Sequence, residues 1–137
     1  MTTVNPRRLG DALRECARGI HPLEAGTGLL IDCGSWLHRE DFTSRFITTG
    51  TSISDGTTLA ATDWEAAITA LHGGELPSSG GERRMLLLAA SIAGGIPVSL
   101  YDTLPGIDRS NASLVVDAVA HAAGLADQET DKRYLNG

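Results

Sequence analysis

The sequence has few aromatic residues, a single lysine and no long apolar run. Aromatic residues make up 4% of the 137 residues although 42% are hydrophobic, so the core must consist mostly of Leu, Ile, Val and Ala. Lys132 is the only lysine among eleven basic residues, and this preference for Arg, with many Ala and Gly, indicates a GC-rich bacterial genome. No stretch reaches the ~18 apolar residues that a membrane-spanning helix needs, so we expect no membrane partner.

Cysteine is also scarce. Cys16 and Cys33 are the only two, and the polar N-terminus has no apolar segment of the kind that a signal peptide carries. We therefore expect a cytoplasmic protein, in which thiols stay reduced, and we predict that both cysteines are free and buried.

Positive charge is missing from a long part of the chain. The net charge is −6, and residues 46–81 contain four acidic residues and no Lys or Arg. No third of the sequence carries the excess of cations that would neutralise phosphates, which argues against nucleic acid as a partner. Folding can still bring together the arginines near the N-terminus, which are Arg7, Arg8, Arg14 and Arg18.

The clearest helix signals lie between residues 79 and 124. Ser79 and Glu82 form a capping box at the start of a helix. The run 85–93 is almost wholly apolar, which is typical of a helix buried on all sides. Gly95 and Pro97 end it, because glycine suits a left-handed C-cap and proline cannot continue the helix. We predict a central helix over residues 82–94.

Two further helices are predicted after this central helix. Ser99 begins a short one, and Asp108 caps a long one that Gly124 ends. Apolar residues at helical spacing predict the buried stripe of the long helix, which consists of Leu114, Val115, Ala118, Val119 and Ala122.

Three more helices are predicted in the N-terminal half of the chain. Asn5 and Pro6 begin the first, and its apolar stripe comprises Leu9, Ala12, Leu13, Cys16, Ala17 and Ile20. Residues 23–33 read as either a helix or a turn and strand; we favour the helix, although its two interior glycines cost about 2 kcal/mol. Thr62 and Glu65 form a second capping box before a helix that ends at Gly73.

Residues 45–61 predict a β-hairpin. Ser54 to Thr57 is a turn signal between β-branched residues, and we expect the hairpin to pack on the helices through Phe46, Ile47, Ile53 and Leu59. This Thr-rich segment is a candidate partner-facing surface. The predicted fold is therefore mainly α, with about five helices around the buried helix 82–94 and a small hairpin near residues 45–61. We predict a single domain over residues 1–124 and a polar tail over residues 125–137.

No residue pattern identifies a catalytic centre, a metal site or a cofactor. Cys33 and His38 have the separation of half a zinc site, but the paired spacing of a complete site is absent. Asp117 and His121 are i, i+4 neighbours that suit either acid–base chemistry or an ordinary solvated pair. No motif resembles that of a known family.

We therefore expect a small bacterial accessory or regulatory protein that binds another macromolecule and has no catalysis of its own. The partner is a second protein or a second copy of the chain, as a homodimer. One alternative is a helix-turn-helix-like DNA-binding protein that uses residues 98–124, with Arg109, Asp117 and His121 on its last helix. Another is a small enzyme with a pocket formed by Trp36, His38, Asp41 and Trp64.

Overall fold

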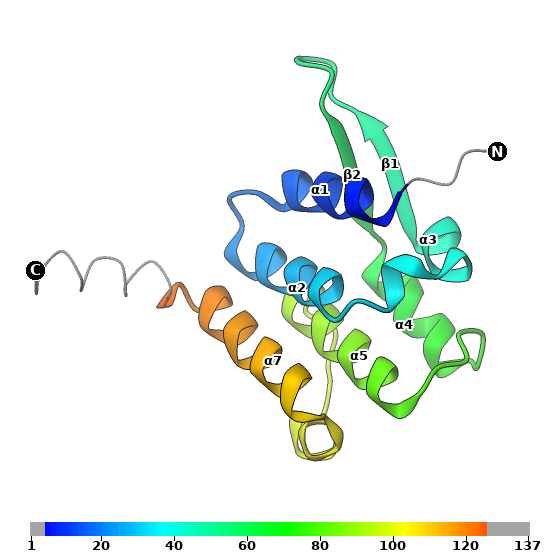
Figure 1. The fold of residues 1–137 in the computed structure, drawn as a ribbon, viewed down its shortest axis with the longest axis vertical. Helices are drawn as coiled ribbons and strands as arrows, with labels where there is room; N and C mark the ends of the chain where they lie inside the picture. The colour runs from blue at the N-terminus through cyan, green and yellow to red at the C-terminus, as the bar shows by residue number, and fades with distance from the viewer. Residues whose placement is uncertain (1–4, 126–137) are drawn as a thin grey trace, which may run out of the picture.

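The computed structural model describes residues 5–125 (Figure 1). Most of these residues lie in seven α-helices, and the only strands among them form one antiparallel hairpin, so the predicted fold class is confirmed. In chain order the elements are α1 (Pro6–Ala17), α2 (His21–Asp32), the 3-10 helix η1 (Trp36–His38), α3 (Glu40–Phe46), β1 (Ile47–Thr51), β2 (Thr58–Thr62), α4 (Trp64–His72), α5 (Gly80–Gly94), α6 (Leu100–Thr103), the 3-10 helix η2 (Leu104–Gly106) and α7 (Arg109–Ala122). All of the tail predicted for residues 125–137 except Leu125 lies outside the described residues.

Short polar side chains cap the N-termini of the helices, mostly at the positions that the sequence predicts. The Ser79 hydroxyl accepts from the backbone N–H of Glu82 at 3.1 Å, and the Glu82 carboxylate accepts from the Ser79 N–H at 2.9 Å. Asn5 and Asp108 likewise cap α1 and α7. The box predicted at Thr62 is wrong, because Asp63 caps α4 instead. The Asp63 carboxylate, one residue nearer the helix than Thr62, is the side chain that accepts a hydrogen bond from the first turn of α4.

Residues 23–33 are helical, and a glycine explains why. Helix α2 packs closely across α5, and a Cβ added to Gly26 would lie 2.4 Å from the Cβ of Ala93 and 2.6 Å from the carbonyl oxygen of Ala89. Only glycine allows this approach of the two backbones. The cost of glycine within a helix is thus offset by packing that sequence periodicity does not reveal.

The core lies around α5 and α2 together. Leu86, Ala89 and Ala90 of α5 are fully buried, as predicted for the central helix. Helix α2 contacts α5, α7 and α1 (Figure 1), and its residues from Ala25 to Leu30 are all buried. The centre of the fold is therefore a pair of crossed helices.

Aromatic side chains join η1 and α3 to this core. The ring centroids of Trp36 and Phe42 are 5.2 Å apart, and those of Phe42 and Phe46 are 5.7 Å apart. The indole N–H of Trp36 donates to the carbonyl oxygen of Glu82 at 2.9 Å. This bond ties η1 to the first turn of α5.

The hairpin forms as predicted but projects further than expected. Helix α1 contacts β2, and the tip of the hairpin extends beyond α1 (Figure 1). Ile53, predicted to pack on the helices, is fully exposed at this tip. The predicted stripe of α1 is also too wide, because Cys16 and Ile20 are exposed while Leu9, Ala12, Leu13 and Ala17 are buried.

The crossing of α2 and α5 predicts opposite effects for two glycines of one helix. Gly26→Ala should lower the free energy of unfolding by about 1–3 kcal/mol, because the new methyl group overlaps the α5 backbone. Gly28→Ala meets only the Arg14 guanidinium at 3.5 Å. It should therefore leave stability unchanged or raise it by up to about 1 kcal/mol, through better helix propensity.

Urea unfolding followed by tryptophan fluorescence measures both variants. Equal effects of the two substitutions would contradict the close crossing.

Candidate functional site

An apolar groove lies between α5, the α6–η2 segment and α7. Its volume is about 490 Å³. Its lining consists of Leu88, Ser91, Ile92, Val98, Leu100, Leu104, Val115, Val116 and Val119. Ser91 is the one polar residue in this lining.

The chain after α5 turns back to form one wall of the groove. Gly95 ends α5 in the left-handed conformation, with φ 70°, and Pro97 prevents the helix from continuing. Ile96 and Val98 pack against the core. The Arg84 guanidinium donates to the Gly106 carbonyl at 3.3 Å and so ties η2 to α5. Proline, glycine and one arginine thus place α6 and η2 beside the groove.

Several large apolar side chains at the rim of the groove are exposed to solvent. Val116 is 66% exposed, Leu100 55% and Val119 54%, and Tyr101 beside Leu100 is largely exposed as well. Isolated exposed apolar side chains are ordinary, but contiguous ones around a concavity mark an interaction site. The groove is therefore the candidate functional site.

A polar contact holds the C-terminal end of α7 against the start of α2. The His121 ring N–H donates to the Glu24 carboxylate, with Nε2 and Oε1 3.0 Å apart. Glu24 also accepts from the Gly19 backbone N–H at 3.0 Å. Both bonds hold the pKa of Glu24 below its usual value, and the bond from the Gly19 backbone lowers it more than the bond from His121. The ring of His21 lies edge-on to that of His121, with centroids 5.9 Å apart.

A small cleft beside this contact contains Asp117 but no hydroxyl or thiol side chain. Its volume is about 120 Å³. Its lining consists of Arg14, Glu24, Ala25, Gly28, Leu29, Asp32, Leu114, Asp117, Ala118 and His121. None of these is Ser, Thr or Cys, and Arg14 is paired with Asp32 at 3.1 Å. The carboxylate–imidazole pair thus orients α7, with no hydroxyl or thiol in the cleft to activate.

The two tryptophans of the proposed enzyme pocket lie apart. Trp36 is fully buried and contacts the first turn of α5 through Glu82. Trp64 packs at the other end of α5, since a Cβ on Gly94 would lie 3.0 Å from its Cβ. Twelve residues of helix separate these ends by about 18 Å. The structure therefore does not bring the two indoles into one pocket.

His38 and Asp41 lie near Trp36 on the surface. Arg39 donates to both carboxylate oxygens of Asp41, at 3.0 and 2.6 Å, and these bonds hold the pKa of Asp41 below its usual value. The same guanidinium lies 4.6 Å from the centroid of the Trp36 ring. Asp41 is thus engaged in holding Arg39 over the core tryptophan, and His38 is exposed.

The cysteines do not match the prediction that both are buried. Cys16 is exposed and Cys33 is half-buried, and both are free. Burial raises the pKa of the Cys33 thiol, which donates to the Leu30 carbonyl at 3.2 Å. A protonated thiol is a poor nucleophile.

Neither a metal centre nor a membrane-spanning helix is found in the part of the chain that the structure describes. Within residues 5–125, no three His, Cys, Asp or Glu side chains form a group that could hold a metal ion. The helices over the same range are too short or too polar to cross a bilayer.

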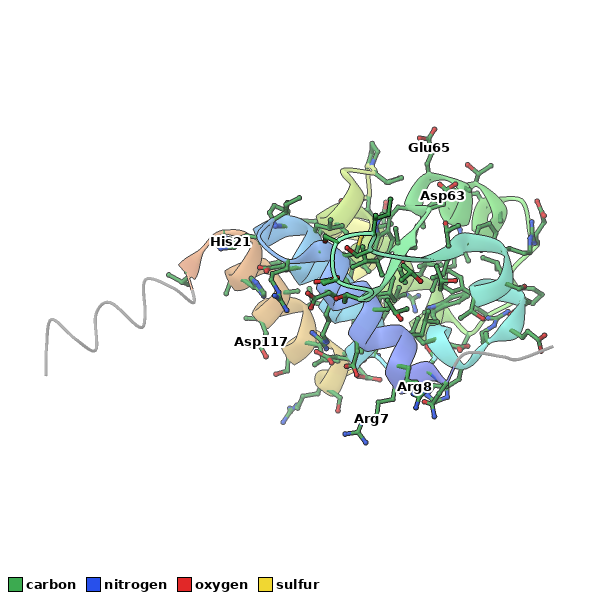
Figure 2. The ribbon with its side chains drawn as sticks, turned by 90° about the horizontal axis from the view of Figure 1, so that it is seen from above. Arg7, Arg8, His21, Asp63, Glu65 and Asp117 are labelled. Carbon is green, nitrogen blue, oxygen red and sulfur yellow. The ribbon has the colours of Figure 1, made fainter. Side chains whose placement is uncertain are left out.

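Charged residues on the surface are dispersed. Arg7 and Arg8 point outward at the start of α1, on the opposite side from Asp63 and Glu65, and Asp117 lies on α7, apart from both pairs (Figure 2). Arg109 is exposed at the start of α7 and is the one Lys or Arg of that helix. The exposed face of α7 therefore carries valine as well as isolated charges.

The sequence did not identify the groove. The helical spacing predicts that Val119 belongs to the buried stripe of α7 and gives Val116 no role, yet both are exposed beside the groove. A usable signal is present in α7: its apolar residues from Leu114 to Val116 span about 200° around the helix axis, which is wider than one buried face. No protein-family model, curated protein or solved structure matches this chain.

The Glu24 contact predicts a pH-dependent contribution to stability. Because the folded pKa is depressed, the contribution is present above the ordinary value of 4.5 and is lost as the pH falls through the folded pKa. Glu24→Gln should lower the free energy of unfolding by about 1 kcal/mol at pH 7, and the difference from the wild type should vanish in acid.

Urea unfolding at a series of pH values tests this. Glu15→Gln is the control, since Glu15 pairs with Arg18 on the surface and should change stability little. A Glu24→Gln effect that is the same at all pH values would refute the assignment.

Proposed function

We propose that this chain is a small accessory protein that binds a partner protein by accepting an amphipathic α-helix of that partner in the α5–α6–α7 groove. The observation that carries the proposal is the continuous apolar lining, with Val116 and Leu100 exposed at its rim. We place the protein in the bacterial cytoplasm, where free Cys16 and Cys33 stay reduced.

The lining favours a macromolecule over a small ligand. Sites for small molecules combine apolar walls with several polar groups that fix the orientation of the ligand. Here Ser91 is the only polar residue in the lining, and the exposed apolar surface continues outward to Tyr101. Tyrosine on the rim of an apolar groove is typical of protein interfaces.

A helix suits this groove better than an extended segment. An extended peptide needs hydrogen-bond partners for its backbone, and the lining side chains offer only the Ser91 hydroxyl. A helix satisfies its own backbone and presents apolar residues at i, i+3, i+4 and i+7. Its apolar face would cover the exposed parts of Val116 and Val119.

DNA binding through residues 98–124 has weaker support. A recognition helix presents polar and cationic side chains to bases and phosphates. Helix α7 offers Arg109 alone as a cation, together with exposed Val116 and Val119 and the acidic Asp117. This surface suits an apolar partner better than a phosphate backbone.

Site-specific photo-crosslinking tests the proposal. We expect benzoylphenylalanine at position 116, in the full chain in its own cells, to crosslink to a segment with apolar residues at helical spacing. The matched control is position 113, because Ser113 is exposed on the same helix but does not line the groove. Equal crosslinking at both positions, or crosslinks confined to this chain, would overturn the proposal.

A charge in the groove should weaken the same interaction. Val116→Glu places a carboxylate where the partner helix packs and should weaken binding of the crosslinked segment, made as a peptide, at least about tenfold. Ser113→Glu adds the same charge outside the groove and should change the affinity less than about twofold. Fluorescence anisotropy with the labelled peptide measures both, and similar losses for the two variants would contradict a groove-bound helix.

A further inference from the structure

Ser91 places a single polar group among the apolar side chains of the groove. Leu88, Ser91 and Ile92 line the groove from α5, and residues at i, i+3 and i+4 lie on one side of a helix. The rest of the lining consists of Val and Leu side chains from α7 and from residues 98–104. The side chains that share the groove with the Ser91 hydroxyl therefore neither donate nor accept a hydrogen bond.

The Ser91 hydroxyl has no hydrogen-bond partner among residues 5–125. A serine or threonine within a helix commonly donates to the carbonyl oxygen four residues before it. Ser44 and Thr69 make this bond, at 2.6 and 2.9 Å. Ser91 makes neither this bond, which would go to the Leu87 carbonyl, nor any other side-chain bond within the described range.

This unpaired hydroxyl is accessible from the groove. Of the buried side-chain oxygen and nitrogen atoms in the described part of the chain, only Thr62 Oγ1 lacks a hydrogen-bond partner. Ser91 is half-buried and its oxygen is not one of these enclosed atoms, so it is open to the groove that it lines. A partner that covers the groove removes water from this oxygen and must replace the hydrogen bond or leave the hydroxyl unpaired.

A wholly apolar partner surface would bind this groove less well than one with a polar group in the right place. Burying a polar group without a hydrogen-bond partner is unfavourable and weakens binding by a factor of roughly 5 to 100. A site that contains a polar group discriminates strongly against a partner that cannot bond to it. The hydroxyl therefore favours a helix with a hydrogen-bonding side chain opposite Ser91.

A charged side chain does not suit this position. The lining contains no Lys, Arg, His, Asp or Glu, so a charge placed there would leave water without a counter-ion. A neutral side chain avoids this cost. The hydroxyl of Ser or Thr and the carboxamide of Asn or Gln can each both donate and accept, so any of them can pair with the Ser91 hydroxyl in either direction.

We propose that Ser91 determines which helix the groove binds: the partner helix carries one Ser, Thr, Asn or Gln within its apolar face, and this side chain hydrogen-bonds to the Ser91 hydroxyl. The inference rests on the proposed function of the groove and adds the residue that sets its specificity. A polar pair in an apolar interface also fixes the register of two helices, because a shift along the axis leaves both groups unpaired.

Affinity measurements with the segment crosslinked through position 116, made as a synthetic peptide, test the proposal. We expect Ser91→Ala to weaken binding about fivefold or more, because the polar side chain of the peptide loses its partner. Replacing that polar side chain by Leu should weaken binding to the wild type by a similar factor. The Leu peptide should recover most of this loss on Ser91→Ala. Fluorescence anisotropy of the four combinations gives a double-mutant cycle.

Two controls separate binding from folding. Ser113→Ala removes an exposed hydroxyl of α7 outside the groove and should leave the affinity unchanged. Ser91→Ala should fold normally, with its stability toward urea unchanged or raised, because it removes an unpaired hydroxyl and alanine has the higher helix propensity. A loss of affinity in a variant of full stability is therefore a loss of recognition.

The outcomes distinguish this inference from the proposed function. A crosslinked segment with a wholly apolar face, or one that binds the wild type and Ser91→Ala equally, would overturn the role of Ser91 while the groove still binds a helix. Equal binding would mean that the hydroxyl turns to the Leu87 carbonyl when the groove is covered. If no helical segment crosslinks at position 116, the proposed function fails and this inference fails with it.

Discussion

The close crossing of α2 and α5 is the constraint on which the rest of the structure depends. Gly26 has no side chain, so the α2 backbone approaches Ala89 and Ala93 of α5 within the space that a methyl group would occupy. Helix α7 is then positioned against both helices, and the Glu24–His121 bond holds one of its ends to α2. The groove lies where α7 and α5 separate, and α6 and η2 form its remaining wall.

Local chemistry explains how much of this fold the sequence could predict. A helix cap needs one acceptor within three residues, so Asn5, Ser79 and Asp108 marked their helices correctly. Gly26 was instead counted as a cost, because its benefit comes from contact with residues more than sixty positions away. Cys16 and Ile53 are exposed although the sequence predicts core contacts for them, because periodicity identifies an apolar face but not how far neighbouring elements cover it.

The same limit applied to the candidate site. The sequence suggested a pocket from residue types that often act in sites, such as Trp36, which the structure uses as a core residue bonded to α5. Val116 and Leu100 look like ordinary core residues in the sequence. Only the position of α6 relative to α7 shows that they remain exposed together.

Methyl NMR of the full chain tests the central claim most directly, that the groove binds a helix of another protein. The titrant is the segment crosslinked through position 116, made as a synthetic peptide. We expect the largest shift changes at the methyl groups of Leu100, Val116 and Val119, and a gain of helical signal in the peptide. Shift changes centred on the hairpin, with the Val116 methyls unmoved, would contradict the claim.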